Sequence, residues 1–74
     1  MTAVPTGRRR YLLTVRWDGL NYVAEKWLVG WPVCVDMRYV GTEDTPLAEA
    51  VVDAEHHFGL RASVAPGTPD EPRI

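Results

Sequence analysis

The 74-residue sequence contains one cysteine, Cys34, and one serine, Ser63. A single cysteine excludes an internal disulfide and favours a reducing compartment, and we expect Cys34 to be a core or sheet residue. A chain this short buries only about 60% of the surface that its unfolded form exposes. We therefore expect one complete small domain that gains further stability from self-association or from a partner.

Long hydrophobic runs are also missing, which excludes a membrane-spanning helix. The segment after Arg8–Arg10 begins like a signal peptide, but its apolar run is broken at Thr14 and Arg16, and no cleavage site follows. We expect a cytoplasmic protein that does not contact a membrane.

Groups for catalysis or metal binding are few. The sequence has no phosphate-cradling glycine loop. His56 and His57 are adjacent on an expected helix, so their side chains point about 100° apart and cannot chelate one ion. Asp53 and His57 share a helix face, but two ligands do not make a metal site. We expect no enzymatic activity, no cofactor and no metal.

The net charge of −2 is unevenly distributed. Residues 1–17 hold four arginines and no acid, whereas residues 43–55 hold five acids and no base. This asymmetry fits simple solubility. It also fits two ends that face different partners, or that face each other in an oligomer.

Residues 11–17 show the period-two pattern of a half-buried strand, with Tyr11, Leu13, Val15 and Trp17 on one face. Asp18-Gly19 follows at once, and such a pair after an alternating run is a strong hairpin signal. We therefore expect a turn at about residues 18–21.

The next segment, residues 20–28, fits two structures. Its apolar residues match the spacing of a helix face, while its composition and the preceding Asp-Gly turn favour a strand over residues 21–29. We favour the strand and leave the helix open. Pro32 ends this segment, and Trp31 in the turn is a candidate contact residue because exposed tryptophan commonly anchors a partner.

Residues 33–40 form the clearest predicted strand. We expect one alternating set to face the core, namely Val33, Val35, Met37 and Tyr39. Asp36 and Arg38 should then face solvent or a partner.

A helix is predicted from about Thr45 to Phe58. Thr45 would be the N-cap, Pro46 the first helical residue, and Gly59 the stop. Its apolar stripe consists of Leu47, Ala50, Val51, Ala54 and Phe58.

The expected fold is therefore α+β: a three-stranded antiparallel meander packed against one C-terminal helix, with residues 60–65 as a potential short fourth strand. We divide the chain into a flexible basic arm (1–9), a single domain (10–65) and a disordered Pro-rich tail (66–74).

The order of these elements resembles the HicB-type antitoxin domain. The matching residues are Asp18-Gly19, Tyr22-Val23-Ala24, Pro32, Gly41, Thr45, Leu47 and Glu49-Ala50, within residues 10–58. The resemblance implies a compact β-β-β-α domain that binds a small toxin and often self-associates. The usual Leu-Pro-Gly turn is replaced here by Gly30-Trp31-Pro32-Val33, and no DNA-binding module is expected after the helix. Operator binding is therefore not expected.

Our leading hypothesis is a small non-enzymatic protein-binding module that forms homo-oligomers. In its most specific form, it is a HicB-like antitoxin that neutralises a basic toxin or another protein. A phage- or mobile-element-type inhibitor or accessory protein is an alternative. The partner-binding residues that we select are Trp31, Arg38, Glu49 and Asp53. A further alternative is a nucleic-acid-binding module that uses Arg8, Arg9 and Arg10 together with a sheet face carrying Tyr11, Arg16, Trp17, Arg38 and Tyr39.

Overall fold

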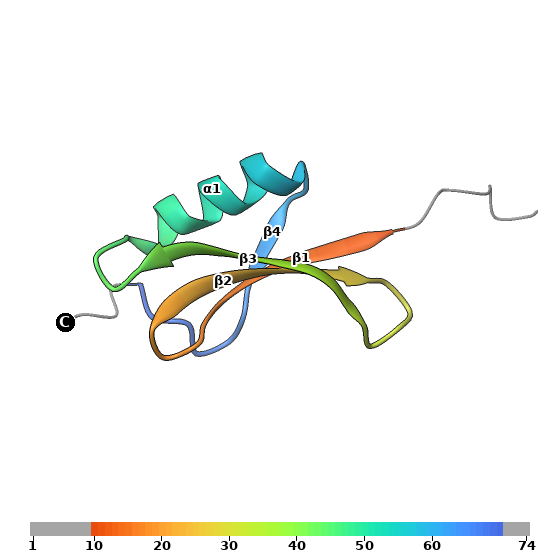
Figure 1. Cartoon of the computed structure of the whole chain (residues 1–74), viewed down its shortest axis with the longest axis horizontal. Coiled ribbons are helices and arrows are strands. Elements are labelled where there is room, and N and C mark those ends of the chain that lie inside the picture. The colour runs from red at the N-terminus through yellow and green to blue at the C-terminus, as the bar shows by residue number, and fades with distance from the viewer. Residues whose placement is uncertain (1–9, 71–74) are drawn as a thin grey trace, which may run out of the picture.

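The computed structural model describes residues 10–70, which form a four-stranded sheet with one helix on it (Figure 1). The elements in chain order are β1 (Tyr11–Trp17), β2 (Asn21–Leu28), β3 (Cys34–Thr42), α1 (Leu47–Phe58) and β4 (Ala62–Val64). The strand order is β3-β2-β1-β4; β1, β2 and β3 are antiparallel neighbours, and β4 is parallel to β1. The predicted β-β-β-α architecture with a short fourth strand is confirmed.

The Asp18-Gly19 turn joins β1 to β2 as predicted. Asp18 Oδ1 accepts hydrogen bonds from the backbone N–H groups of Leu20 (2.8 Å) and Asn21 (2.7 Å). These bonds, chiefly the one from Asn21, hold the pKa of the Asp18 carboxyl below its usual value. Gly19 has a φ of 106°, a backbone conformation that residues other than glycine rarely adopt.

The core lies between α1 and one side of the sheet. β1 contributes Leu13 and Val15, β2 contributes Tyr22 and Ala24, and α1 contributes Ala50 and Ala54, all of them buried. The remaining members of the predicted helix stripe, Leu47, Val51 and Phe58, pack around this cluster.

Of the two structures predicted for this segment, a strand and a helix, the chain forms the strand, β2. Its lack of one clean apolar face follows from its central position in the sheet. Tyr22 and Ala24 are buried under the helix, while Val23 points to the opposite side and is only 1% exposed. Apolar residues on both faces resemble a helix pattern when they are read without the sheet.

The predicted orientation of β3 is wrong. Val35, Met37 and Tyr39 are exposed, and Val40 is the β3 residue that enters the core. The pairing of β3 with β2 has irregularities between Tyr22 and Val23 and between Lys26 and Trp27. One extra residue in a strand reverses which side chains face the core, and the sequence pattern alone does not reveal it.

The helix starts later than predicted. α1 begins at Leu47, and Pro46 occupies the cap position without a side-chain hydrogen bond. Thr45 is not the N-cap, because its Oγ1 accepts the N–H of Thr42 (3.0 Å) and so closes the preceding loop. The predicted stop is confirmed, since Gly59 has left-handed geometry with a φ of 68°.

The segment after β4 is tied to the domain as far as Asp70. The Asp70 carbonyl accepts the N–H of Leu47 (3.1 Å), one of the helix N-terminal donors that no residue within the helix can satisfy. The Tyr22 hydroxyl donates to the Pro69 carbonyl. The predicted basic arm and the end of the Pro-rich tail, residues 71–74, lie outside the described residues.

Candidate protein-binding surface

Large apolar side chains gather on β3 and on the turn before it. Five of them are between 45% and 66% exposed, and we call them the β3 patch: Trp31, Val33, Val35, Met37 and Tyr39. Figure 1 shows the β2–β3 turn projecting beyond the end of α1, so the helix does not cover this part of the sheet. A run of exposed apolar residues of this kind marks an interaction surface more often than isolated ones do.

The β3 patch faces mainly away from the helix. Tyr39 pairs with Val23 and Met37 pairs with Glu25, and directly opposed residues on neighbouring strands share a side of the sheet. Val23 alternates with the helix-side residues Tyr22 and Ala24, so it defines the opposite side, which we call the open side. No described element packs over the open side.

Polar groups on the open side are already paired with each other. Arg16 Nε and Nη2 donate to Glu25 Oε1 (3.0 Å) and Oε2 (3.3 Å), a two-pronged ion pair. Hydrogen bonding to Glu25 is the main reason that the pKa of Arg16 is raised. Trp27 Nε1 donates to Thr14 Oγ1 (3.2 Å). The open side therefore offers apolar contact beside polar side chains that already have hydrogen-bond partners.

The outer edge of β3 also carries backbone N–H and C=O groups that have no strand partner within residues 10–70, because β3 is the end strand of the sheet. Leu28 N–H donates to Val33 O, whereas Val29 N–H donates to Arg10 O. Even-numbered residues of β2 thus direct their backbone groups to β3. The backbone groups of their partners Asp36 and Arg38 are directed to β2, which leaves the backbone groups of Met37 and Tyr39 directed outward. Val35 has no partner on β2, because the register shifts between Asp36 and Cys34.

The charged side chains of β3 lie on the helix side of the sheet. Arg38 pairs with Ala24, and Asp36 pairs with Lys26. Lys26 itself lies over the Tyr11 ring, with Nζ 4.3 Å from the ring centre. Arg38 makes no ion pair within residues 10–70.

The four predicted partner-binding residues do not form one site. Trp31 and Arg38 are exposed on the β2–β3 turn and on β3, while Glu49 and Asp53 are exposed on the outer face of α1. The patch residues Val33, Val35, Met37 and Tyr39 were missed, because the alternation of β3 assigned them to the core. A signal was present, since the helix stripe has only five apolar side chains, two of them alanines, to cover three strands.

The sheet face predicted for nucleic acid is not formed. Tyr11 and Trp17 lie on the helix side, where Trp17 packs on the core. The ring centres of Trp17 and Tyr22 lie 5.1 Å apart in an edge-to-face arrangement. Arg16 and Tyr39 lie on the open side, and Arg16 is engaged by Glu25. Of the three arginines predicted for nucleic acid, Arg10 is described and exposed, and Arg8 and Arg9 lie outside the described residues.

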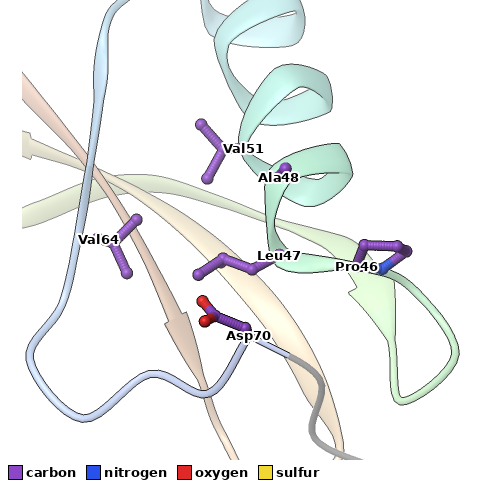
Figure 2. Close-up of a pocket in the computed structure, with 6 residues that line it drawn as sticks. All are labelled: Pro46, Leu47, Ala48, Val51, Val64 and Asp70. Carbon is purple, nitrogen blue, oxygen red and sulfur yellow. The ribbon is translucent and has the colours of Figure 1, made fainter.

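A concave feature lies at the start of the helix. This open groove has a volume of about 470 Å³ and is lined by Pro46, Leu47, Ala48, Val51, Val64 and Asp70. Figure 2 shows Leu47 and Val51 of α1 pointing toward Val64 of β4. Its lining is almost wholly apolar, and Asp70 contributes its one carboxylate.

Residues 10–70 contain no cluster of three or more histidine, cysteine or acidic side chains that could hold a metal ion. Cys34 lies in the sheet as predicted, at the first position of β3, but it is exposed and not part of the core. Within the same range, no helix is long and apolar enough to cross a membrane.

Comparisons with protein-family models, curated proteins and solved structures gave no match to this chain.

Proposed function

We propose that this chain is a small, cytoplasmic, non-enzymatic protein-binding module that contacts a partner protein through the β3 patch. The observation that carries the proposal is the set of five exposed apolar side chains, from Trp31 to Tyr39, beside a sheet side that no described element covers. Covering this set would remove apolar area from water, which is the main driving force of protein association.

The composition of the patch supports a protein rather than a small ligand as its occupant. Tryptophan, tyrosine and methionine are enriched in protein interfaces, and the two aromatic residues are common energetic anchors. Trp31 and Tyr39 are the most exposed members of the patch, at 66% and 60%. The patch is a surface along a strand and a turn, whereas small-molecule sites are concave and enclosed.

The best named version of this function is HicB-like neutralisation of a toxin. Its support is the β-β-β-α order and the packing of the motif residues where β3 meets α1. A Cβ atom on Gly41 would lie 2.9 Å from Thr45 Cβ and 3.1 Å from Tyr22 Cδ2, so these three motif positions touch. In this version a basic toxin is attracted by Glu49 and Asp53, both exposed on α1.

The proposal is tested by a tagged pull-down from the native host with nuclease treatment, read by mass spectrometry. The bait would be the wild type, the double variant Met37→Ser/Tyr39→Ser and the double variant Glu49→Lys/Asp53→Lys. All four positions are exposed, so each variant should keep the fold, which circular dichroism checks.

We expect one stoichiometric protein with the wild type and its loss with the β3 double variant. A small basic partner that is also lost with the helix variant would support the toxin version. A partner retained by the β3 variant would overturn the assignment of the surface. Recovery that collapses on nuclease treatment would favour nucleic acid over a protein partner.

A further inference from the structure

We propose that β3 pairs antiparallel with β3 of a second copy, in a two-fold arrangement centred on Met37. This inference rests on the proposed function, because it names a second copy as one occupant of the β3 region. It concerns the backbone edge and the charges of the strand, so it fails or succeeds separately from the capture of a different partner on the open side.

The first support is the exposed backbone edge. All residues from Cys34 to Tyr39 are exposed, and no described segment covers their outer side. The outward backbone groups belong to Met37 and Tyr39. An exposed, apolar end strand whose outer backbone groups have no strand partner is a template for pairing with another chain.

The second support is the charge pattern, which selects one pairing register. A two-fold antiparallel pair needs outward residues opposite outward residues, which a centre at Met37 satisfies because Met37 then lies opposite itself. Centred on Met37, Asp36 of each copy lies opposite Arg38 of the other, which gives two complementary ion pairs.

The two neighbouring registers are unfavourable. A shift of the centre to residue 36 places Asp36 opposite Asp36, and a shift to residue 38 places Arg38 opposite Arg38. Like charges directly opposed across strands are destabilising. The strand is thus complementary to itself in the register centred on Met37.

The local geometry suits these ion pairs. Residues 36 and 38 would occupy the non-hydrogen-bonded positions, where opposing Cα atoms are only about 4.5 Å apart and side chains approach closely. The central hydrogen-bonded position would pair Met37 with Met37, which exchanges two backbone hydrogen bonds. The side chains of Met37 and Tyr39 lie on the open side, so the dimer would join two β3 patches into one surface.

One existing contact must be exchanged. In the single chain, Asp36 Oδ1 accepts the Met37 N–H (2.8 Å), which occupies an outward backbone donor. On pairing, that N–H would donate to the Met37 carbonyl of the second copy, and the carboxylate would turn to Arg38 of that copy. One hydrogen bond to a charged acceptor is thereby replaced by a backbone bond and an ion pair.

The test is sedimentation equilibrium of the purified full chain over a range from micromolar to millimolar concentrations. It compares the wild type, Asp36→Arg, Arg38→Asp and the charge-swapped double variant Asp36→Arg/Arg38→Asp. Each single variant places like charges opposite each other twice, so we expect its dimer dissociation constant to rise at least tenfold. The swap restores opposite charges, and we expect its constant to return to within about threefold of the wild type.

A chemical cross-link checks the register independently. In a Cys34→Ser background, Met37→Cys should be joined to its copy by a short bis-thiol reagent. Val35→Cys should not, because two residues at position 35 would lie about 14 Å apart along the strands. Thermal unfolding of each variant shows that it is folded.

A wild-type chain that stays monomeric at millimolar concentration would overturn the dimer and leave the pull-down result intact. A swapped variant no better than the single variants, or a cross-link at Val35→Cys without one at Met37→Cys, would overturn the register. A dimer that forms as described while the pull-down recovers no other protein would instead overturn the binding of a different partner.

Discussion

Replacing Leu13 by alanine tests whether the side of the sheet that faces α1 is the core of this protein. Leu13 is 1% exposed and lies in the cluster with Val15, Tyr22, Ala50 and Ala54. Leu20 provides a matched control, because it is 77% exposed in the β1–β2 turn and allows the same substitution.

A buried leucine changed to alanine costs about 2–5 kcal/mol, from lost burial and from the cavity left behind. Stabilities of about 0.05–0.15 kcal/mol per residue give a domain of this size about 4–11 kcal/mol in total. The substitution would therefore remove a large share of the stability. The exposed control should change it by less than about 0.5 kcal/mol.

The assay is thermal unfolding followed by circular dichroism, at one protein concentration for all variants. For a domain of 60–100 residues, each 1 kcal/mol shifts Tm by about 4–8 °C, so a loss of 2 kcal/mol lowers Tm by about 8–16 °C. We expect a fall of at least this size for Leu13→Ala and almost none for Leu20→Ala. Equal shifts for the two variants would refute the assignment of the core.

Three further predictions concern the turn, the β3–α1 junction and the C-terminal segment. Gly41→Ala should cost about 1–3 kcal/mol, because its Cβ would lie 2.9 Å from Thr45 Cβ; an unchanged urea midpoint would contradict this close packing. Tyr22→Phe should cost about 0.5–1.5 kcal/mol and speed proteolysis of the segment around Pro69, whose carbonyl accepts the Tyr22 hydroxyl; equal proteolysis would contradict that tie. Because the pKa of Asp18 is lowered in the folded state, its contribution to stability is complete above about pH 4 and is lost as pH falls through the folded-state pKa. Urea unfolding between pH 4 and 2 should therefore show a smaller loss of stability for Asp18→Asn than for the wild type.

Local signals in the sequence predicted much of the fold. The alternation of β1, the Asp18-Gly19 turn and the helix stripe each depend on residues close together in the chain. Gly59 predicted the helix end for the same reason, because only the residue that adopts left-handed geometry decides it.

Most of the features that were missed depend on contacts between residues far apart in the chain. The orientation of β3 changes at Val40, the extra residue between the partners of Tyr22 and Val23. The residue types around Val40 do not predict that irregularity. The helix start is shifted because Thr45 bonds to Thr42, and the first helical N–H is satisfied by the backbone carbonyl of Asp70. A backbone carbonyl carries no sequence signal, so this cap could not be read from the chain.

The candidate surface was only partly predictable for the same reason. Trp31 was selected because it lies in a turn beside Pro32 and because an exposed tryptophan commonly anchors a partner. Tyr39 was placed in the core, and only the pairing with Val23 shows that it lies on the side opposite the helix.

Site-specific photo-crosslinking in the native host tests the central claim most directly, that this protein acts through contacts of its β3 patch. A photoreactive phenylalanine analogue would replace Tyr39 on the open side in one variant and Asp53 on α1 in the other, and the adducts would be read by mass spectrometry. We predict protein adducts from position 39, with a second copy, another protein or both. Adducts from position 53 alone, or none from position 39 in a folded protein, would contradict the account.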